Sequence, residues 1–403
     1  MYTRKHIDFL LSFFREQQEV QPLTNLAESD WSEVVQLAIR QRMAPLLYAQ
    51  LKTFPAQDIP GRFFKRLERE YLNSAMTNMV IFTEFSRVFN VLHENDLSFI
   101  ALKGAHLAEG VYSDPALRIL TDLDILVRET DVSRAASLLM QIGYAPWDKT
   151  VDDPADHHLP PLVKSGTLPV EIHWDLHRVR VPGRTDIVGL WERAVPAKLG
   201  PGKALVLSVE DLLLHLSLHA SQHYFDSKLS SVYDVHEIIR SSHSQINWKE
   251  LEARAHRWGA GKAFFLMLLL SVDLLGTAVP IGFLERIRPA DFAQDFQEFA
   301  RVQMFADTEA VSERMAEMHR TRSLRDKVRI LSEVLFCPSE CSDKNRPVPK
   351  SAKLLYPLWR LKSLLSSEYG RSMWQIRHTD EKDLILTNPD AARTLMNWLL
   401  KPD

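Results

Sequence analysis

The sequence predicts an α/β (α+β) fold in which a small mixed sheet is flanked by N-terminal and C-terminal helical regions. Three observations lead to this prediction. Apolar residues recur at helical spacing up to about residue 95, strand-length apolar runs alternate with helix-like stretches from there to about 200, and helical spacing returns from Ser208 onward. We therefore expect an N-terminal helical region (1–95), a central catalytic core (96–200) and a C-terminal helical domain (201–403).

The N-terminal region is expected to consist of helices. Ile7, Leu10, Leu11 and Phe14 are spaced as on one face of a helix. A long helix is predicted from Phe63 to His93, where polar and apolar residues interleave at a period of 3.6.

The central part alternates strands and helices. Strands are predicted at 97–102, 122–128, 158–164 and 168–176, and helices at 105–112 and 132–142. Gly143 is a good residue to end the second helix, and Ser165-Gly166-Thr167 is a hairpin-type turn between the last two strands. After this core, helices are predicted at 209–222, 228–242, 247–258 and 260–275, and a Pro-rich, charged loop around 337–350 precedes a last helical stretch.

Composition excludes several classes of protein. The net charge of −3 provides no basic field for nucleic acid or anionic lipid, and no aromatic interleaving marks a nucleic-acid platform. Cys337 and Cys341 are too few for a disulfide framework and lack partners at zinc-finger spacing, so a loop is expected there. The N-terminus has no signal-peptide pattern, and the longest apolar stretch, Ala263–Leu270, is too short to span a bilayer. A cytoplasmic protein without a membrane partner is expected.

Asp122 and Asp124 stand two residues apart in the apolar run from Ile119 to Val127. Alternate side chains of a strand point to the same face, so both carboxylates share one face while Leu123 and Ile125 share the other. Two carboxylates in apolar surroundings repel each other and lose hydration, and a divalent cation is the usual compensation. The pattern favours a metal site over an edge strand with a solvated face.

Glu171 offers a third carboxylate from a second predicted strand. It shares one face of that strand with His173 and Asp175. If the two strands are neighbours, Glu171 completes a cluster with Asp122 and Asp124. Hard oxygen ligands in that number suit Mg²⁺, which keeps other positions for water and substrate phosphates. Taken alone, Glu171 is typical of a half-buried strand glutamate with a local partner.

The junction at Lys103-Gly104 joins a predicted strand to a predicted helix. A glycine there lets the backbone approach a phosphate, the helix N-terminus offers free N–H groups, and Lys103 adds a point charge. A plain strand-to-helix turn is the alternative, because the Walker A pattern is absent. Arg118, four residues before Asp122, either clamps phosphate or neutralises the carboxylates.

Several histidines are candidate metal ligands. His215, His219 and His223 recur at i, i+4 and i+8, so they lie along one face of a helix. A row along one helix cannot surround a tetrahedral zinc ion. A helix packed near the active-site cleft, with His219 reaching substrate, is therefore favoured over a zinc site. His223 would then be a cation at the helix C-terminus. Asp234 is either a general base for an acceptor hydroxyl or part of a salt bridge within its helix. Asp156-His157-His158 is expected to be a polar loop.

A series of motifs stands in the order Leu102-Lys-Gly104, Tyr112, Arg118, Asp122-Leu-Asp124-Ile-Leu-Val127, Gly143-Tyr144 and Glu171-Ile-His-Trp174. In this order they resemble the bacterial uncharacterised nucleotidyltransferase family, which belongs to the DNA-polymerase-β-like nucleotidyltransferase superfamily. The resemblance covers roughly 97–176 and extends more loosely through Ser208–His215 and Asp234.

The resemblance implies a nucleotidyltransferase core and a metal-dependent enzyme. It makes Asp122, Asp124 and Glu171 the catalytic carboxylates and ligands of Mg²⁺, with two ions expected and Mn²⁺ as an alternative, and it places Gly104 at the turn near the phosphates. With Lys103 and Arg118 also on the phosphates, the chain would transfer a nucleoside monophosphate from an NTP such as ATP to an acceptor hydroxyl.

One position departs from the superfamily pattern. Lys103-Gly104-Ala105 stands where many members have Gly-Gly or Gly-Ser, so a serine hydroxyl is missing and Lys103 would take over phosphate binding. A catalytically inactive scaffold or adaptor that binds a partner is the alternative function. The acceptor (a small molecule, a protein or RNA), the preferred nucleobase and the oligomeric state leave no motif in the sequence.

Overall fold

The computed structural model describes residues 3–16, 26–147, 157–176, 185–222, 225, 228–305 and 389–401. Contacts divide the chain into two units, one formed by His6–Met304 with Pro389–Asp403 and the other by Met1–Lys5 with Phe305–Asn388. Nearly all described residues belong to the first unit, and the fold below is that of this unit. The loop predicted around 337–350, its two cysteines and the helical stretch predicted after it lie outside the described residues.

Within the described residues, seven strands form one mixed sheet in the order β3-β4-β5-β2-β1-β7-β6. Their bounds are β1 Phe99–Ala101, β2 Leu123–Val127, β3 Ala145–Pro146, β4 Leu162–Val163, β5 Val170–His173, β6 Val195–Leu199 and β7 Gly202–Val206. The central pairs are mixed, since β2 runs antiparallel to β1 and parallel to β5, while β1 runs parallel to β7. The small mixed sheet predicted from the sequence is confirmed.

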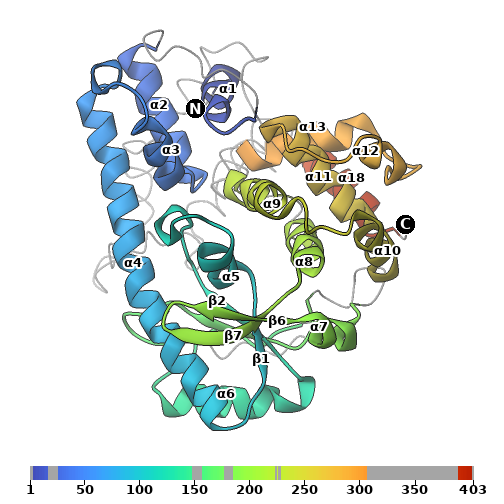
Figure 1. Ribbon diagram of the computed structural model, residues 1–403. Coiled ribbons are helices and arrows are strands. Elements are labelled where there is room, and N and C mark those ends of the chain that lie inside the picture. Colours follow the sequence, from blue (N-terminus) through green and yellow to red (C-terminus); the bar gives the residue numbers. More distant parts are fainter. Residues whose placement is uncertain are drawn as a thin grey trace, which may run out of the picture. The chain divides into compact units, whose positions relative to one another are not determined.

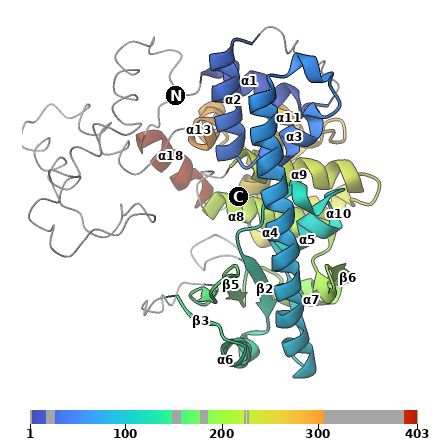
Figure 2. The ribbon, with the colours of Figure 1, turned by 90° about the vertical axis from the view of Figure 1, so that its left-hand side faces the viewer.

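The long helix α4 (Gly61–Glu94) and the shorter α6 (Val132–Gln141) pack on one face of this sheet (Figures 1 and 2). Alternate residues of the strands project into this core, which explains why β2 and β5 read as alternating runs. The buried set includes Phe85 and Phe89 from α4, Leu139 from α6, Ile125 from β2 and Ile172 from β5. The opposite side chains of β2 and β5 are therefore free to form the polar site described below.

The helices before the sheet are α1 (Arg4–Ser12), α2 (Glu28–Arg40), α3 (Ala44–Leu51) and α4. Helix α4 packs along α2 and α3 and continues past them onto β7 and α6 (Figure 1). Its buried residues are mostly apolar toward both ends, where it packs on the N-terminal helices and on the sheet, and polar (Ser74 and Asn78) between Leu67 and Ile81. The predicted helix at 63–93 is confirmed, whereas the proposed boundary at 95 stays a prediction.

Helix α5 (Lys103–Gly110) follows β1, and α7 (Ile187–Arg193) precedes the β6–β7 hairpin. After the sheet come α8 (Val209–Gln222), α9 (Leu229–Ser242), α10 (Trp248–Trp258), α11 (Gly261–Leu275), α12 (Phe283–Arg286), α13 (Gln294–Phe305) and α18 (Pro389–Leu399). Short 3-10 helices are η2 (Ala56–Asp58), η3 (Pro115–Leu117) and η4 (Glu129–Asp131).

The C-terminal helices α8 to α11 agree with the prediction to within a residue or two at each end. Helix α18 returns to this group, because Asp291 accepts hydrogen bonds from Lys262 of α11 (2.9 Å) and from the Trp398 indole of α18 (2.9 Å). Trp398 also stacks on Phe296, with ring centroids 4.7 Å apart. In the described part of the chain, no helix is both long enough and apolar enough to cross a membrane.

The strand predictions hold with three differences, of which one is the short edge strand β3, which was not predicted. The strand expected at 158–164 is shortened to β4 and an isolated bridge between His158 and His173. The β6–β7 hairpin was missed, although Val195–Val206 alternates around Gly200-Pro201-Gly202. Gly200 has φ +57°, and a Cβ there would lie 2.8 Å from the Cβ of Phe82, so this turn requires glycine.

Candidate active site

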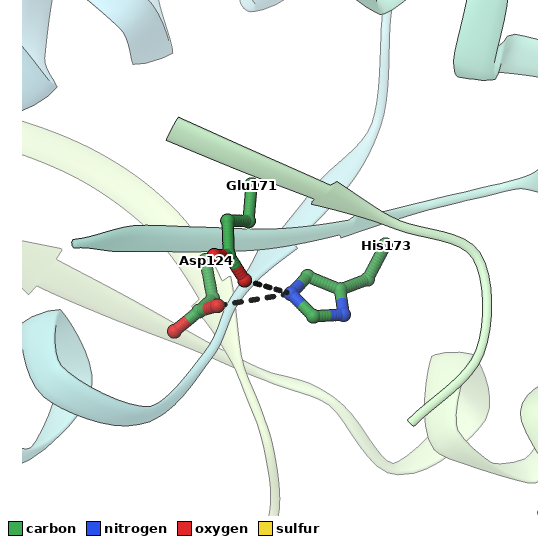
Figure 3. Close-up of side chains that lie close together, drawn as sticks. All are labelled: Asp124, Glu171 and His173. Atoms are coloured by element: carbon green, nitrogen blue, oxygen red, sulfur yellow. Dashed lines mark hydrogen bonds and ion pairs between the residues drawn. The ribbon is translucent and has the colours of Figure 1, made fainter. Parts of the chain in front are cut away.

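Asp124 and Glu171 lie side by side at the centre of the sheet. Strands β2 and β5 are parallel, and their register pairs Asp124 with Glu171. Both carboxylates point toward His173 (Figure 3), whereas the alternate residues Ile125 and Ile172 belong to the packed core. Asp124 is 1% exposed, while Glu171 is half-buried. The condition set by the sequence, that these two strands be neighbours, is met.

His173 joins the two carboxylates into one cluster. Its Nε2 lies 2.9 Å from Asp124 Oδ1 and 3.5 Å from Glu171 Oε2 (Figure 3). Ligand atoms of these three residues all lie within 4.8 Å of one another, and no other group of this kind is found among the described residues. We call Asp124, Glu171 and His173 the acidic cluster. The sequence placed His173 on the correct face but gave it no role.

Asp122 lies next to this cluster, one residue before β2 begins. It is half-buried, and its carboxylate accepts a hydrogen bond from the hydroxyl of Thr121 at 3.3 Å. Burial, together with the charge of Asp124, raises the pKa of Asp122 to about 6, although Lys103 acts in the opposite direction. Two carboxylates are thus close enough to repel each other, as the alternation in the sequence suggested.

Lys103 supplies a positive charge at the centre of the site. Its Nζ donates a hydrogen bond to Asp124 Oδ1 at 3.1 Å, and its side chain is 12% exposed. Burial lowers the pKa of Lys103, but Asp124, Asp122 and Glu171 more than offset this effect and raise it. Lys103 also has φ +39°, a left-handed conformation that costs a non-glycine residue about 1 kcal/mol or more. The hydrogen bond to Asp124 holds the ammonium in place, and the backbone at Lys103 is strained.

Protein groups neutralise Asp124 in part. Burial raises the pKa of Asp124, yet the Lys103 ammonium and the hydrogen bond from His173 hold it well below its usual range. Its second oxygen, Oδ2, is buried and has no hydrogen-bond partner among the described residues. A buried carboxylate oxygen without a donor is costly, and a bound cation would remove that cost. The donor set of two carboxylates and an imidazole fits a divalent cation.

Gly104 is buried in the first turn of α5. A Cβ at this position would lie 3.1 Å from Cδ2 of Leu120, which is tighter than ordinary contact. The close approach of Leu120 thus accounts for a small residue here. Helix α5 begins at Lys103, two residues earlier than predicted, and the side chain of this first residue reaches Asp124 of the acidic cluster.

Arg118 forms a buried ion pair with Asp234 of α9. Its Nε donates to Oδ1 at 2.8 Å and its Nη2 donates to Oδ2 at 2.9 Å. Tyr112 donates to the same Oδ1 at 2.7 Å. Asp234 therefore pairs with a residue 116 positions away, not with a neighbour in its own helix. Of the two roles considered for Arg118, the structure shows it neutralising a carboxylate, and that carboxylate belongs to Asp234.

Arg42 is a further cation near the site that sequence analysis did not single out. It lies between α2 and α3 with φ +58°. Burial and the charge of Arg118 lower the pKa of Arg42, whereas Asp122 and Asp234 act in the opposite direction. Within the described residues its guanidinium makes no hydrogen bond or ion pair. In the sequence, Arg42 is an arginine in a short turn between two helices, and such arginines are too common to indicate a functional site.

Histidines border the acidic cluster on two sides. The rings of His157 and His158 lie 5.4 and 4.9 Å from the ring of His173, measured between centroids. On α8, the ring of His215 lies 6.4 Å from that of His219, and the charge of His219 acts on Asp124. Helix α8 thus packs near the site, as expected, whereas His223 lies outside the described residues.

Residues 27–276 match the uncharacterised nucleotidyltransferase family, and this range is more than half of the chain. The mixed sheet and its flanking helices are consistent with a core of the nucleotidyltransferase class. The chain therefore belongs to the uncharacterised nucleotidyltransferase family, as the motifs suggested. No match is found among proteins of curated function.

Proposed function

We propose that this nucleotidyltransferase transfers a nucleoside monophosphate from an NTP to an acceptor hydroxyl and releases pyrophosphate. The observation that carries the proposal is the pairing of Asp124 with Glu171 across β2 and β5, with Asp122 two residues before Asp124, just ahead of β2. Three carboxylates from two neighbouring strands are the arrangement in which phosphoryl transfer is assisted by divalent ions. Membership of the family supports the same reaction.

Asp122, Asp124 and Glu171 would hold divalent ions, with Mg²⁺ as the expectation and Mn²⁺ as the alternative, and two ions are expected. When bound, such ions polarise the phosphoryl group and lower the pKa of the attacking hydroxyl. The buried, unpartnered Oδ2 of Asp124 supports this role for the residue. If the bound ions neutralise the carboxylates, the Lys103 ammonium is available to bind a phosphate oxygen.

The triphosphate would lie against Lys103, the backbone at Gly104 and the N-terminal turn of α5. This turn offers N–H groups and the positive end of the helix dipole, which favour an anion. Arg118 adds positive charge at close range, although its guanidinium already binds Asp234. Arg42, whose guanidinium makes no ion pair in the described part of the chain, would contribute charge from the same side.

The proposal is tested by replacing one carboxylate at a time. Asp124→Asn keeps the shape of the side chain but removes the charge, and it should lower metal-dependent NTP turnover at least about a hundredfold. Asp175→Asn is the matched control, because Asp175 follows β5, and among the described residues its carboxylate accepts a hydrogen bond from the backbone of Leu176 alone. Incubation with each labelled NTP, Mg²⁺ and a cell lysate would show where the label is transferred. Turnover of Asp124→Asn at the level of the unmodified chain would refute the proposed function.

A further inference from the structure

The acidic cluster contains a nitrogen donor that an Mg²⁺ site built from three carboxylates lacks. Asp124 and Glu171 offer oxygens, and His173 offers Nε2 from the same strand as Glu171 (Figure 3). Mg²⁺ prefers an all-oxygen shell and dehydrates reluctantly, whereas imidazole binds well to divalent ions of the first transition series. The chemistry of the donors therefore distinguishes between the two kinds of ion.

The distances from His173 to the two carboxylates are close to those between ligands that share one ion. Bonds of about 2.1 Å at octahedral or tetrahedral angles place neighbouring ligand atoms about 3.0–3.4 Å apart. His173 Nε2 lies 2.9 Å from Asp124 Oδ1 and 3.5 Å from Glu171 Oε2. The His173 side chain is 2% exposed, and its backbone lies in β5, next to the strand that carries Asp124.

Asp124 has a second carboxylate oxygen, which is not the one that faces His173 (Figure 3). Asp124 Oδ2 is buried and accepts no hydrogen bond from the described residues. Because a carboxylate only accepts, His173 Nε2 carries the hydrogen of its contact with Asp124 Oδ1 in the metal-free chain. An ion bound at Nε2 replaces that hydrogen: a neutral imidazole then carries its proton on Nδ1, and a protonated imidazole releases one proton.

We propose that the acidic cluster binds a divalent ion of the first transition series, with His173 Nε2 as a ligand beside Asp124 and Glu171, in preference to Mg²⁺. The inference rests on the proposed function, since it specifies the ion at the same site. It also assigns His173, which otherwise only hydrogen-bonds a carboxylate, a direct role in holding the metal.

The test uses Mn²⁺ and the full chain without nucleotide. Electron spin echo modulation of bound Mn²⁺ detects a directly coordinated imidazole nitrogen, and the signal of free Mn²⁺ gives its affinity. Displacement of Mn²⁺ by Mg²⁺ gives the affinity for Mg²⁺. We expect nitrogen coupling in the unmodified chain and binding of Mn²⁺ at least about tenfold tighter than binding of Mg²⁺. Absence of nitrogen coupling or of Mn²⁺ binding would overturn the inference, and this measurement needs no variant.

His173→Gln then identifies the nitrogen. We expect loss of the coupling and a fall in Mn²⁺ affinity of at least about tenfold, with less than about threefold change for Mg²⁺. His158→Gln is the control, because its ring is a neighbour of His173 but belongs to no ligand group of the described residues. Equal losses for both ions in His173→Gln, or loss of the coupling only in His158→Gln, would contradict the assignment.

These outcomes are separable from failure of the proposed function. Metal binding through His173 without turnover of any NTP would refute nucleotidyl transfer and leave the metal assignment standing. Turnover supported by Mg²⁺, together with no nitrogen coupling, would refute the metal assignment and leave nucleotidyl transfer standing.

Discussion

Asp234→Asn should destabilise the chain strongly, because it leaves a buried guanidinium without its counter-charge. The side chains of Arg118 and Asp234 are 13% and 1% exposed, and the pair is bidentate. Asparagine keeps one acceptor but turns an amide NH₂ toward the cation and removes the opposite charge. Breaking a buried pair in this way costs about 3–5 kcal/mol, whereas a well-exposed pair costs less than about 1 kcal/mol.

The assay is urea-induced unfolding, followed by tryptophan fluorescence and by circular dichroism. Tyr112→Phe is the matched control, since it removes one hydrogen bond to the same carboxylate but keeps the ion pair, and it should cost about 1 kcal/mol. The double variant Arg118→Met with Asp234→Leu removes both charges and should recover at least half of the loss. A loss below about 1 kcal/mol for Asp234→Asn would refute the view that this pair is buried and bidentate.

The same variants separate the two roles of Arg118. If Arg118 acts only on Asp234, NTP turnover by the double variant should return to near the original KM once stability is recovered. If Arg118 also contacts the triphosphate, KM for the NTP should stay raised in the double variant although its stability is restored. This comparison decides between neutralisation of Asp234 alone and an added contribution to phosphate binding.

Lys103→Met should destabilise the chain by about 3 kcal/mol, because Asp124 loses a buried partner. If Mg²⁺ binds the same carboxylate, adding it should reduce the loss of stability measured by urea unfolding. Burial lowers the pKa of His106 from 6.5 to about 4. Between pH 6.5 and about pH 4, His106 is therefore protonated in the unfolded chain but neutral in the folded chain. Stability should therefore fall by up to about 3 kcal/mol as the pH falls through this window, and His106→Gln should flatten that part of the profile of unfolding free energy against pH. An unchanged profile would show that His106 is not the group responsible. Gly200→Ala should lower the free energy of unfolding by at least about 2 kcal/mol, because the position combines a positive φ with a 2.8 Å approach of the new Cβ to Phe82. A melting temperature equal to that of the unmodified chain would contradict this.

The local elements could be predicted because they depend on short-range periodicity. Helices α8 to α11 and the strand that carries Asp124 each show their period in the residues themselves. The β6–β7 hairpin was missed because its alternation is short and includes two prolines, Pro196 and Pro201, which usually argue against a strand. Here Pro196 lies in β6, the edge strand of the sheet, where its missing N–H costs least.

The candidate site was predictable only in part. The alternation around Asp122 and Asp124 and that around Glu171 showed which side chains share a face, and the motif order pointed to the family. Nothing in a single sequence reports which strands are neighbours, because strand pairing depends on packing between segments that are distant along the chain.

The sequence by itself determined the helical regions, the strands that carry the carboxylates and the family to which the chain belongs. Only the tertiary structure decided that Asp124 pairs in register with Glu171, that His173 Nε2 lies between their carboxylates, and that Lys103 neutralises Asp124. It also decided that Arg118 pairs with Asp234, a residue 116 positions later. The physical reason is that the periodicity of an element is written in neighbouring residues, whereas the compensation of a buried charge depends on whichever distant groups the packed core brings within a few ångströms.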